Sequence, residues 1–150
     1  MSRVATVVAT KCGGVGPAAR ADSELAPLAR AAIADAIESW DGFSPQGALE
    51  ATWRLLSATN AYLEEHAPWK MAPGPDVDAV LGDALEVLRL AALLAAPAMP
   101  AVCAEIWRRI GLSGSPQDST IDAAARWGLY PGDLTVEKGD PLFPRIRTDA

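Results

Sequence analysis

The chain has 150 residues, half of them hydrophobic, which fits one domain with a core large enough to fold without disulfides or a metal. Thirteen basic and nineteen acidic side chains give a net charge of −6, which argues against an indiscriminate binder of nucleic acids or anionic membranes. A single histidine, His66, and two distant cysteines, Cys12 and Cys103, are too few for a Cys/His zinc site.

The cysteines and the hydropathy pattern favour a cytoplasmic protein. Both cysteines are expected to be small buried thiols of a reducing compartment. The N-terminal residues carry too weak an apolar run for a signal peptide. The longest uncharged stretch, residues 90–104, contains two prolines and is shorter than the roughly 20 residues that span a bilayer. We therefore expect no membrane association.

Proline and glycine divide the first half of the chain into three predicted helices. The first runs from near Met1 to about residue 10 and ends at the glycines of residues 13–16. No capping residue precedes it, so we expect the true helix to start upstream of this chain. The second begins after Asp22 or Ser23 and runs to about residue 40, with apolar residues at helical spacing that include Leu28. The third starts at Ser44-Pro45 and runs to about residue 66.

The second half predicts three further helices and a tail. The helix over residues 76–96 is apolar around more than half its circumference, so we expect it to be the most buried. A fifth helix covers residues 101–110, and a short sixth opens at Ser119 or Thr120 and ends near Gly128. Residues 129–150 indicate an extended tail laid back over the helices. The fold class is therefore an all-α bundle of five or six helices in a single domain.

The basic residues of the first helix stand out in an acidic chain. Residues 1–20 contain Arg3, Lys11 and Arg20 with no acidic residue, whereas residues 21–150 contain ten basic and nineteen acidic side chains. The first helix is therefore the part of the chain where we expect a polyanion to bind.

No residue set predicts catalysis. Glu64-Glu65-His66 are neighbours at a helix end, where their side chains diverge, so we interpret them as a solvated helix end. The glycine run of residues 13–16 lacks the Gly-Lys-Ser/Thr ending of a phosphate loop and is interpreted as a connector. We predict no catalytic residue, metal or cofactor in this chain.

Two residues near the end of the third helix stand out. Asn60 interrupts an apolar face between Leu56 and Leu63, which favours a buried amide that ties down a neighbouring helix or loop. Trp69 follows a proline just past the helix end, where it is either a buried cap or a stacking platform at the surface. Composition alone favours burial of Trp69.

Four motifs in order resemble one family. Asn60-Ala61-Tyr62, followed after five residues by Pro68-Trp69, resembles the Asn-x-Tyr-x5-Pro-Trp signature of the anticodon-binding domain of methionyl-tRNA synthetases. The apolar run of residues 93–100 ending in Pro-x-x-Pro, the helix of residues 106–112 and the closing Pro-Leu-Phe-Pro-Arg-Ile of residues 141–146 resemble later parts of the same domain. The resemblance covers nearly the whole chain.

The resemblance implies an anticodon site made of Arg3 and Trp69. In the family, the tryptophan of the Pro-Trp pair and an arginine early in the first helix contact the anticodon, and Ser2-Arg3 reproduces the context of that arginine. The family's third contact, an asparagine one turn earlier, would lie ahead of residue 1. An indole can stack on a splayed base, and a guanidinium can bind a base edge or a phosphate. Lys11, Asn60 and Lys70 are expected to support this site.

The implied function is recognition of the anticodon loop of methionine tRNA in support of aminoacylation. The family's catalytic half carries His-Ile-Gly-His-type and Lys-Met-Ser-Lys-Ser-type motifs, and neither occurs here. ATP and methionine would bind that catalytic domain, so we expect this chain alone to be inactive. The expected partners are methionine tRNA and either a catalytic synthetase domain or a dimer partner, without DNA. The alternative is a stand-alone helical-bundle relative that acts as a protein-interaction module without tRNA binding.

Overall fold

The structure, a computed structural model, describes residues 1–142 as a helical bundle, which confirms the predicted all-α class. Its elements are α1 (Ser2–Lys11), β1 (Val15–Gly16), α2 (Leu25–Asp41), α3 (Pro45–His66), the 3₁₀ turn η1 (Pro68–Lys70), α4 (Pro75–Ala95), α5 (Pro100–Arg109), the 3₁₀ turn η2 (Pro116–Asp118), α6 (Ile121–Ala124) and β2 (Leu134–Thr135).

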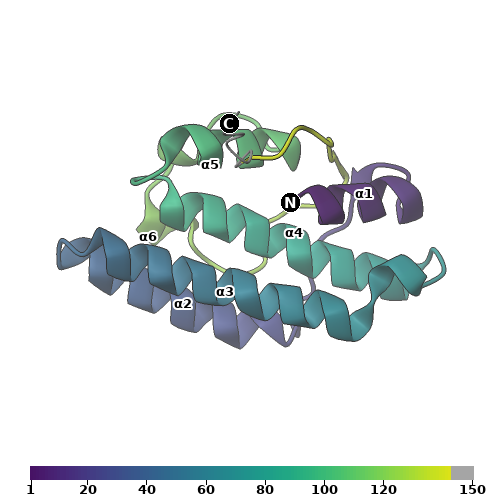
Figure 1. Ribbon diagram of the computed structural model, residues 1–150, viewed down its shortest axis with the longest axis horizontal. Coiled ribbons are helices and arrows are strands. Elements are labelled where there is room, and N and C mark those ends of the chain that lie inside the picture. Colours follow the sequence, from purple (N-terminus) through teal and green to yellow (C-terminus); the bar gives the residue numbers. More distant parts are fainter. Residues whose placement is uncertain (143–150) are drawn as a thin grey trace, which may run out of the picture.

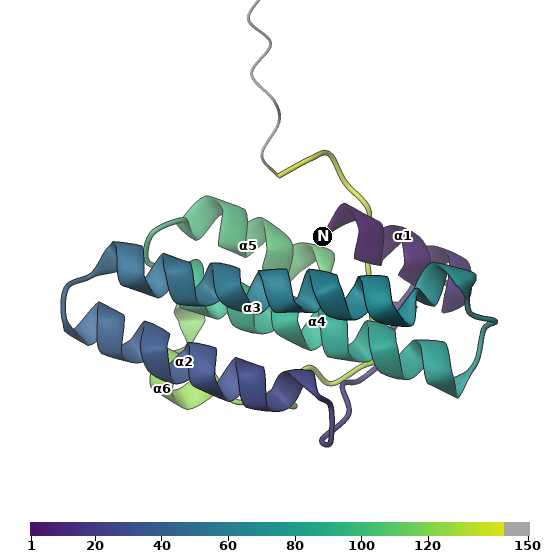
Figure 2. The ribbon, with the colours of Figure 1, turned by 60° about the horizontal axis from the view of Figure 1, so that its bottom comes forward.

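The helix α4 forms the centre of the bundle. It touches each of the other five α-helices, and every residue from Val80 to Ala96 is buried, which confirms that this helix is the most buried. Figure 1 shows α1 and α5 on one side of α4 and the paired helices α2 and α3 on the other. The rotated view in Figure 2 shows α3 and α4 running side by side along the long axis. No helix within residues 1–142 is both long and apolar enough to cross a membrane.

The predicted helix starts are confirmed where a capping side chain is present. Ser44 accepts a hydrogen bond of 3.2 Å from the Gly47 amide at the start of α3, and Pro45 takes the first helical position. Thr120 caps α6 in the same way. These side chains satisfy amide donors that a helix leaves free at its first turn.

The sixth helix is shorter than predicted, because two buried charged side chains form hydrogen bonds with the backbone of the segment that follows it. It ends at Ala124 instead of near Gly128. The Arg89 guanidinium donates to the carbonyls of Ala124 at 2.9 Å and Arg126 at 2.6 Å. The Glu86 carboxylate accepts from the backbone amide of Tyr130 at 2.7 Å. These contacts replace the hydrogen bonds that would continue the helix.

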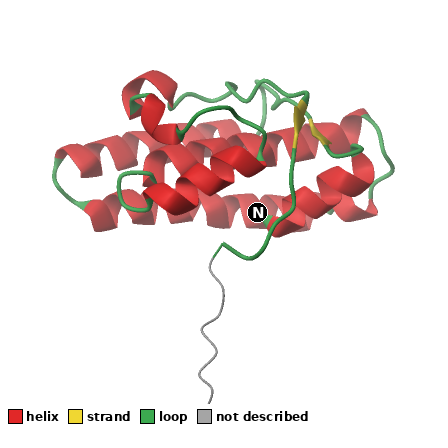
Figure 3. Cartoon of the chain, turned by 90° about the horizontal axis from the view of Figure 1, so that it is seen from above, coloured by secondary structure: helices red, strands yellow, loops and turns green. Residues whose placement is uncertain are grey.

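A two-stranded antiparallel sheet was not predicted and lies where a connector was expected. Val15 pairs with Thr135 and Gly16 with Leu134, so the segment after α1 is joined to the C-terminal part of the chain (Figure 3). A Cβ at Gly16 would lie 2.7 Å from both Leu85 and the Tyr130 hydroxyl, so glycine is required for this close approach. Residues 129–142 contain no helix, as predicted, and residues 143–150 lie outside the described residues.

Small residues decide which faces of α2 and α3 are buried. Ala29 and Ala36 of α2 and Ala48 and Ala51 of α3 are almost fully buried, which allows the two helices to approach closely. Leu28, which was expected on the buried face of the second helix, is 49% exposed. Residue size, more than hydrophobicity alone, therefore sets the orientation of these helices.

Candidate functional site

Trp69 lies in a tight turn that reverses the chain after α3. Helix α3 ends at His66, Ala67 adopts a left-handed conformation with φ 45°, and buried Pro68 begins η1. The Trp69 side chain is partly buried: it packs against the hydrophobic core and remains partly exposed to solvent. The composition-based expectation of burial is therefore only partly met, and the ring is accessible at the surface.

The structure brings Arg3 and Trp69 together, although Arg3 lies on the first helix and Trp69 in the turn after the third. The Arg3 guanidinium carbon lies 4.4 Å from the centroid of the Trp69 ring, within the range of a cation–π contact. Arg3 also forms an ion pair with Glu64 on the last turns of α3. The helix α1 positions Arg3 because its valines pack on the core while Arg3 remains exposed on the other face.

An open depression adjoins this pair. It has a volume of about 450 Å³ and is lined by Ser2, Arg3, Thr6, Val7 and Trp69. Its walls combine an aromatic ring, a cation and two hydroxyl groups, which can stack on a flat ring and hydrogen-bond its edge. The two residues singled out as an anticodon site in the sequence thus share one surface hollow.

The two lysines expected to support the site have different positions. Lys70 follows Trp69 directly in η1 and is exposed. Lys11 is at the opposite end of α1 from Arg3, about 12 Å along the helix at the usual rise per residue. It borders a separate hollow, which Asp78 and Asp133 also line. Lys70 is therefore the closer of the two to the depression.

The interpretation of Asn60 as a buried staple is wrong. Its side chain is exposed and makes no hydrogen bond within residues 1–142. The buried face of α3 is rotated from the expected one and includes Thr52 and Thr59. Their hydroxyls donate to carbonyls one turn earlier, at 2.9 and 2.8 Å, and so can be buried without other partners. The apolar spacing through Asn60 therefore did not identify the core face.

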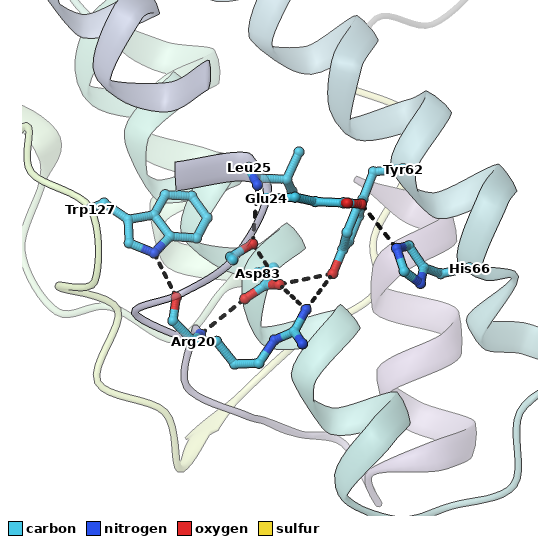
Figure 4. A network of polar contacts seen from close by, with 8 residues as sticks. Arg20, Glu24, Leu25, Tyr62, His66, Asp83 and Trp127 are labelled. Atoms are coloured by element: carbon cyan, nitrogen blue, oxygen red, sulfur yellow. Dashed lines mark hydrogen bonds and ion pairs between the residues drawn. The ribbon is translucent and has the colours of Figure 1, made fainter. Parts of the chain in front are cut away.

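The buried residue of the Asn-x-Tyr signature is the tyrosine, which sequence reasoning missed. The Tyr62 hydroxyl donates to the Asp83 carboxylate at 2.8 Å, and Arg20 donates to the same carboxylate at 2.9 Å and to the Tyr62 oxygen at 3.0 Å (Figure 4). Burial raises the pKa of Tyr62, and its hydrogen bond to Asp83 adds to that effect. The signature itself was the available signal, because it contains Tyr62 together with Asn60.

The charge of Arg20 is consequently engaged by a buried carboxylate, although its own side chain is 43% exposed. Asp83 is fully buried and also accepts from Ser23 at 2.7 Å, so the segment before α2 and helix α3 are both tied to α4 through one carboxylate. The Asp83 hydrogen bond and charge raise the pKa of Arg20. Of the three cations in residues 1–20, Arg20 is paired with buried Asp83 and Arg3 with exposed Glu64. The basic character expected for the first helix is therefore much reduced.

The Glu64-Glu65-His66 segment is a solvated helix end, as interpreted. All three side chains are exposed, and they point to different partners: Glu64 to Arg3, and His66 to Glu24 at 3.0 Å. Glu24, Glu65 and His66 have ligand atoms within 4.8 Å of one another, and within residues 1–142 this is the group with a spacing suited to a metal ion. Exposed carboxylates near a histidine are common without a metal, so this proximity alone does not define a site.

The two cysteines are free thiols of low reactivity. Cys103 is buried, and burial raises its pKa to about 11. Cys12 is only partly buried, and desolvation together with a hydrogen bond of 3.2 Å to Asp78 raises its pKa to about 12. The expectation of a buried thiol is thus confirmed for Cys103 and only partly met for Cys12. Neither thiol has the lowered pKa of a nucleophile.

Comparison with known proteins identifies the family. Residues 16–150 match the family model described as the anticodon binding domain of methionyl tRNA ligase. The chain is 33% identical to the methionine–tRNA ligase of Streptomyces coelicolor over 97% of this chain and 30% of that protein, and 29% identical to that of Enterococcus faecalis over 99% of this chain and 23% of that protein. Trp69 lies inside the family-model match, and Arg3 precedes it.

The solved structures give the same result. The free form of Mycobacterium tuberculosis methionyl-tRNA synthetase superimposes with a TM-score of 0.75 at 26% identity, covering 97% of this chain and 31% of that one. The methionyl-adenylate complex of the same enzyme gives a TM-score of 0.74 at 25% identity. The chain spans less than a third of the length of these relatives.

Proposed function

Since the chain belongs to the family of anticodon-binding domains of methionyl-tRNA ligases, we propose that it binds the anticodon loop of methionine tRNA in support of aminoacylation. The relatives compared above are methionine–tRNA ligases, which favours tRNA binding over the interaction-module alternative. Because the chain would act in aminoacylation, we also propose that it is cytoplasmic.

The observation that supports this function most is the contact between Arg3 and Trp69 beside an open depression. An unpaired RNA loop offers bases that can leave their own stack and lie against an aromatic ring or a guanidinium plane. Arg3 brings hydrogen-bond donors to the edge of the same hollow, so a base stacked there would be held by its face and by its edge. Each stacked base contributes about 1 to 3 kcal/mol.

Binding by this chain alone is expected to be weak. The net charge is −6, and two of the three cations near the N-terminus are already paired with carboxylates. Affinity for RNA depends strongly on the number of phosphates that free cations neutralise. We propose that a catalytic synthetase domain, which would hold ATP and methionine, provides further contacts to the tRNA.

The test is a titration of a labelled anticodon stem-loop at low salt. Fluorescence anisotropy would compare the methionine anticodon CAU with a permuted anticodon in the same stem. Trp69→Ala should weaken binding of the CAU loop about tenfold or more, because it removes the stacking surface. Trp53→Ala is the control, since Trp53 is a surface tryptophan, 46% exposed, that lies outside the depression. Equal binding of both loops by the unmodified chain would contradict the proposal.

A further inference from the structure

Glu64 is the acidic partner of the proposed anticodon-reading arginine. Its carboxylate accepts a hydrogen bond from Nη1 of Arg3, and both side chains are 59% exposed. A guanidinium has five N–H donors. Within residues 1–142, the Arg3 guanidinium donates hydrogen bonds to Glu64 alone, and it also lies over the Trp69 ring. The pair therefore compensates the charge of Arg3 while most of its donors remain available.

The compensated charge and the available donors of Arg3 have different effects on the two kinds of contact that an arginine makes with RNA. A phosphate is held mainly by charge and carries no sequence information, whereas a base edge is held by directed hydrogen bonds and does. A carboxylate next to Arg3 lowers the attraction for any phosphate. It leaves the geometry of the remaining N–H donors over the Trp69 ring intact, because the guanidinium is planar and rigid.

We infer that Glu64 is a specificity-determining residue, which restrains Arg3 from capturing phosphates and so directs it to a base edge. This inference rests on the proposed function of the Arg3 and Trp69 site. The position of Glu64 supports it: the residue lies on α3, one turn before the reversal that carries Trp69, and so is fixed relative to both partners.

The test compares Glu64→Gln with Glu65→Gln. Both variants change the net charge by one unit on the same exposed helix end, but Glu65 has no ion pair within the part of the chain that the structure describes. Each protein would be titrated with the CAU stem-loop and with the permuted stem-loop over a series of salt concentrations. Circular dichroism would verify that both variants are folded.

Glu64→Gln should bind the permuted loop about two- to fivefold more tightly than the unmodified chain does, the size expected for an exposed ion pair. Its preference for CAU should fall by a similar factor. The slope of log affinity against log salt should become steeper by about 0.7, as expected for one additional phosphate contact on a single strand. Glu65→Gln should leave the preference for CAU unchanged.

Two results would overturn the inference while leaving the proposed function intact. One is an equal preference for CAU in both variants with an unchanged salt slope. The other is a loss of CAU binding in Glu64→Gln without any gain for the permuted loop, which would assign Glu64 to holding Arg3 in place. An unmodified chain that fails to distinguish the two loops would instead remove the proposed function itself.

Discussion

The hydroxyl of Tyr62 donates a hydrogen bond of 2.8 Å to the carboxylate of Asp83, which joins the end of α3 to the centre of α4. Asp83 is fully buried, and it also accepts from the side chain of Ser23 and from both the backbone and the side chain of Arg20. The network therefore fixes the last turns of α3, from which the chain reverses to present Trp69. A buried carboxylate with this many donors is well satisfied.

Tyr62→Phe should destabilise the fold by about 2 kcal/mol, because it removes a hydrogen bond to a buried charge. Asp83→Asn should cost more, about 3 to 5 kcal/mol, because it also breaks the ion pair with Arg20 and leaves buried donors without a charged acceptor. Urea denaturation followed by circular dichroism measures both. A Tyr62→Phe variant with unchanged stability would contradict the role assigned to this hydroxyl.

Glu86→Gln should loosen the segment after α6. Glu86 and Arg89 are almost fully buried and paired, and Glu86 also accepts from the backbone amide of Tyr130. Loss of the charge should lower the free energy of unfolding by about 3 to 5 kcal/mol. Amide hydrogen exchange should accelerate most in residues 125–136.

The control for this variant is Asp35→Asn, which breaks an exposed pair with Arg54. Exposed pairs contribute at most about 1 kcal/mol. If hydrogen exchange after Glu86→Gln rose uniformly over the whole chain, the local anchoring of residues 125–136 by Glu86 would be disproved.

The cysteines should resist alkylation in the folded protein. Their pKa values are raised, to about 11 for Cys103 and about 12 for Cys12, so little thiolate exists at pH 8. Iodoacetamide should therefore react with them about a hundredfold more slowly than in the urea-unfolded chain, where thiols have a pKa of about 8.5. Mass spectrometry of the alkylated peptides gives both rates. Fast labelling of Cys103 in the folded state would contradict its burial.

The same pKa shifts predict a loss of stability at alkaline pH. Well below the unfolded pKa of about 8.5, both thiols are protonated in the folded and the unfolded chain, so the stability is fully present. As the pH rises toward 11, the unfolded chain loses thiol protons that the folded chain retains, and the free energy of unfolding decreases. Cys103→Ala should make this decrease smaller in urea denaturation between pH 8 and 10. An identical pH dependence in that variant would refute the assignment.

The helical framework was predictable from the sequence because its signals are local. Ser44-Pro45 marks the start of α3 through a capping hydroxyl and a proline at the first helical position, and both depend only on neighbouring residues. The burial of α4 followed from its apolar circumference. Both predictions are confirmed.

Two of the errors come from interactions between residues far apart in the sequence, and the third comes from a local one. The pairing of residues 15–16 with residues 134–135 and the capture of the backbone after α6 by Arg89 and Glu86 depend on tertiary contacts that no local pattern records. Asn60 was misplaced because threonines can be buried in a helix by bonding to their own backbone. In the candidate site, the position of Trp69 after a helix end was visible in the sequence, whereas the pairing of Arg3 with Glu64 was not.

Stacking of a nucleobase on Trp69 is tested most directly by the indole N–H signals of the five tryptophans. Trp40, Trp107 and Trp127 each donate this N–H to a backbone carbonyl, whereas Trp53 and Trp69 have no such acceptor within residues 1–142. In ¹H–¹⁵N NMR spectra, the indole signal of Trp69 can be assigned because it disappears in the Trp69→Phe variant.

On addition of the CAU stem-loop, the indole signal of Trp69 should shift progressively, because a stacked base changes its magnetic environment. The signal of Trp53 should remain in place, and the permuted stem-loop should shift neither. A Trp69 signal that stays fixed at saturating CAU stem-loop, while another indole signal moves, would contradict base stacking on Trp69.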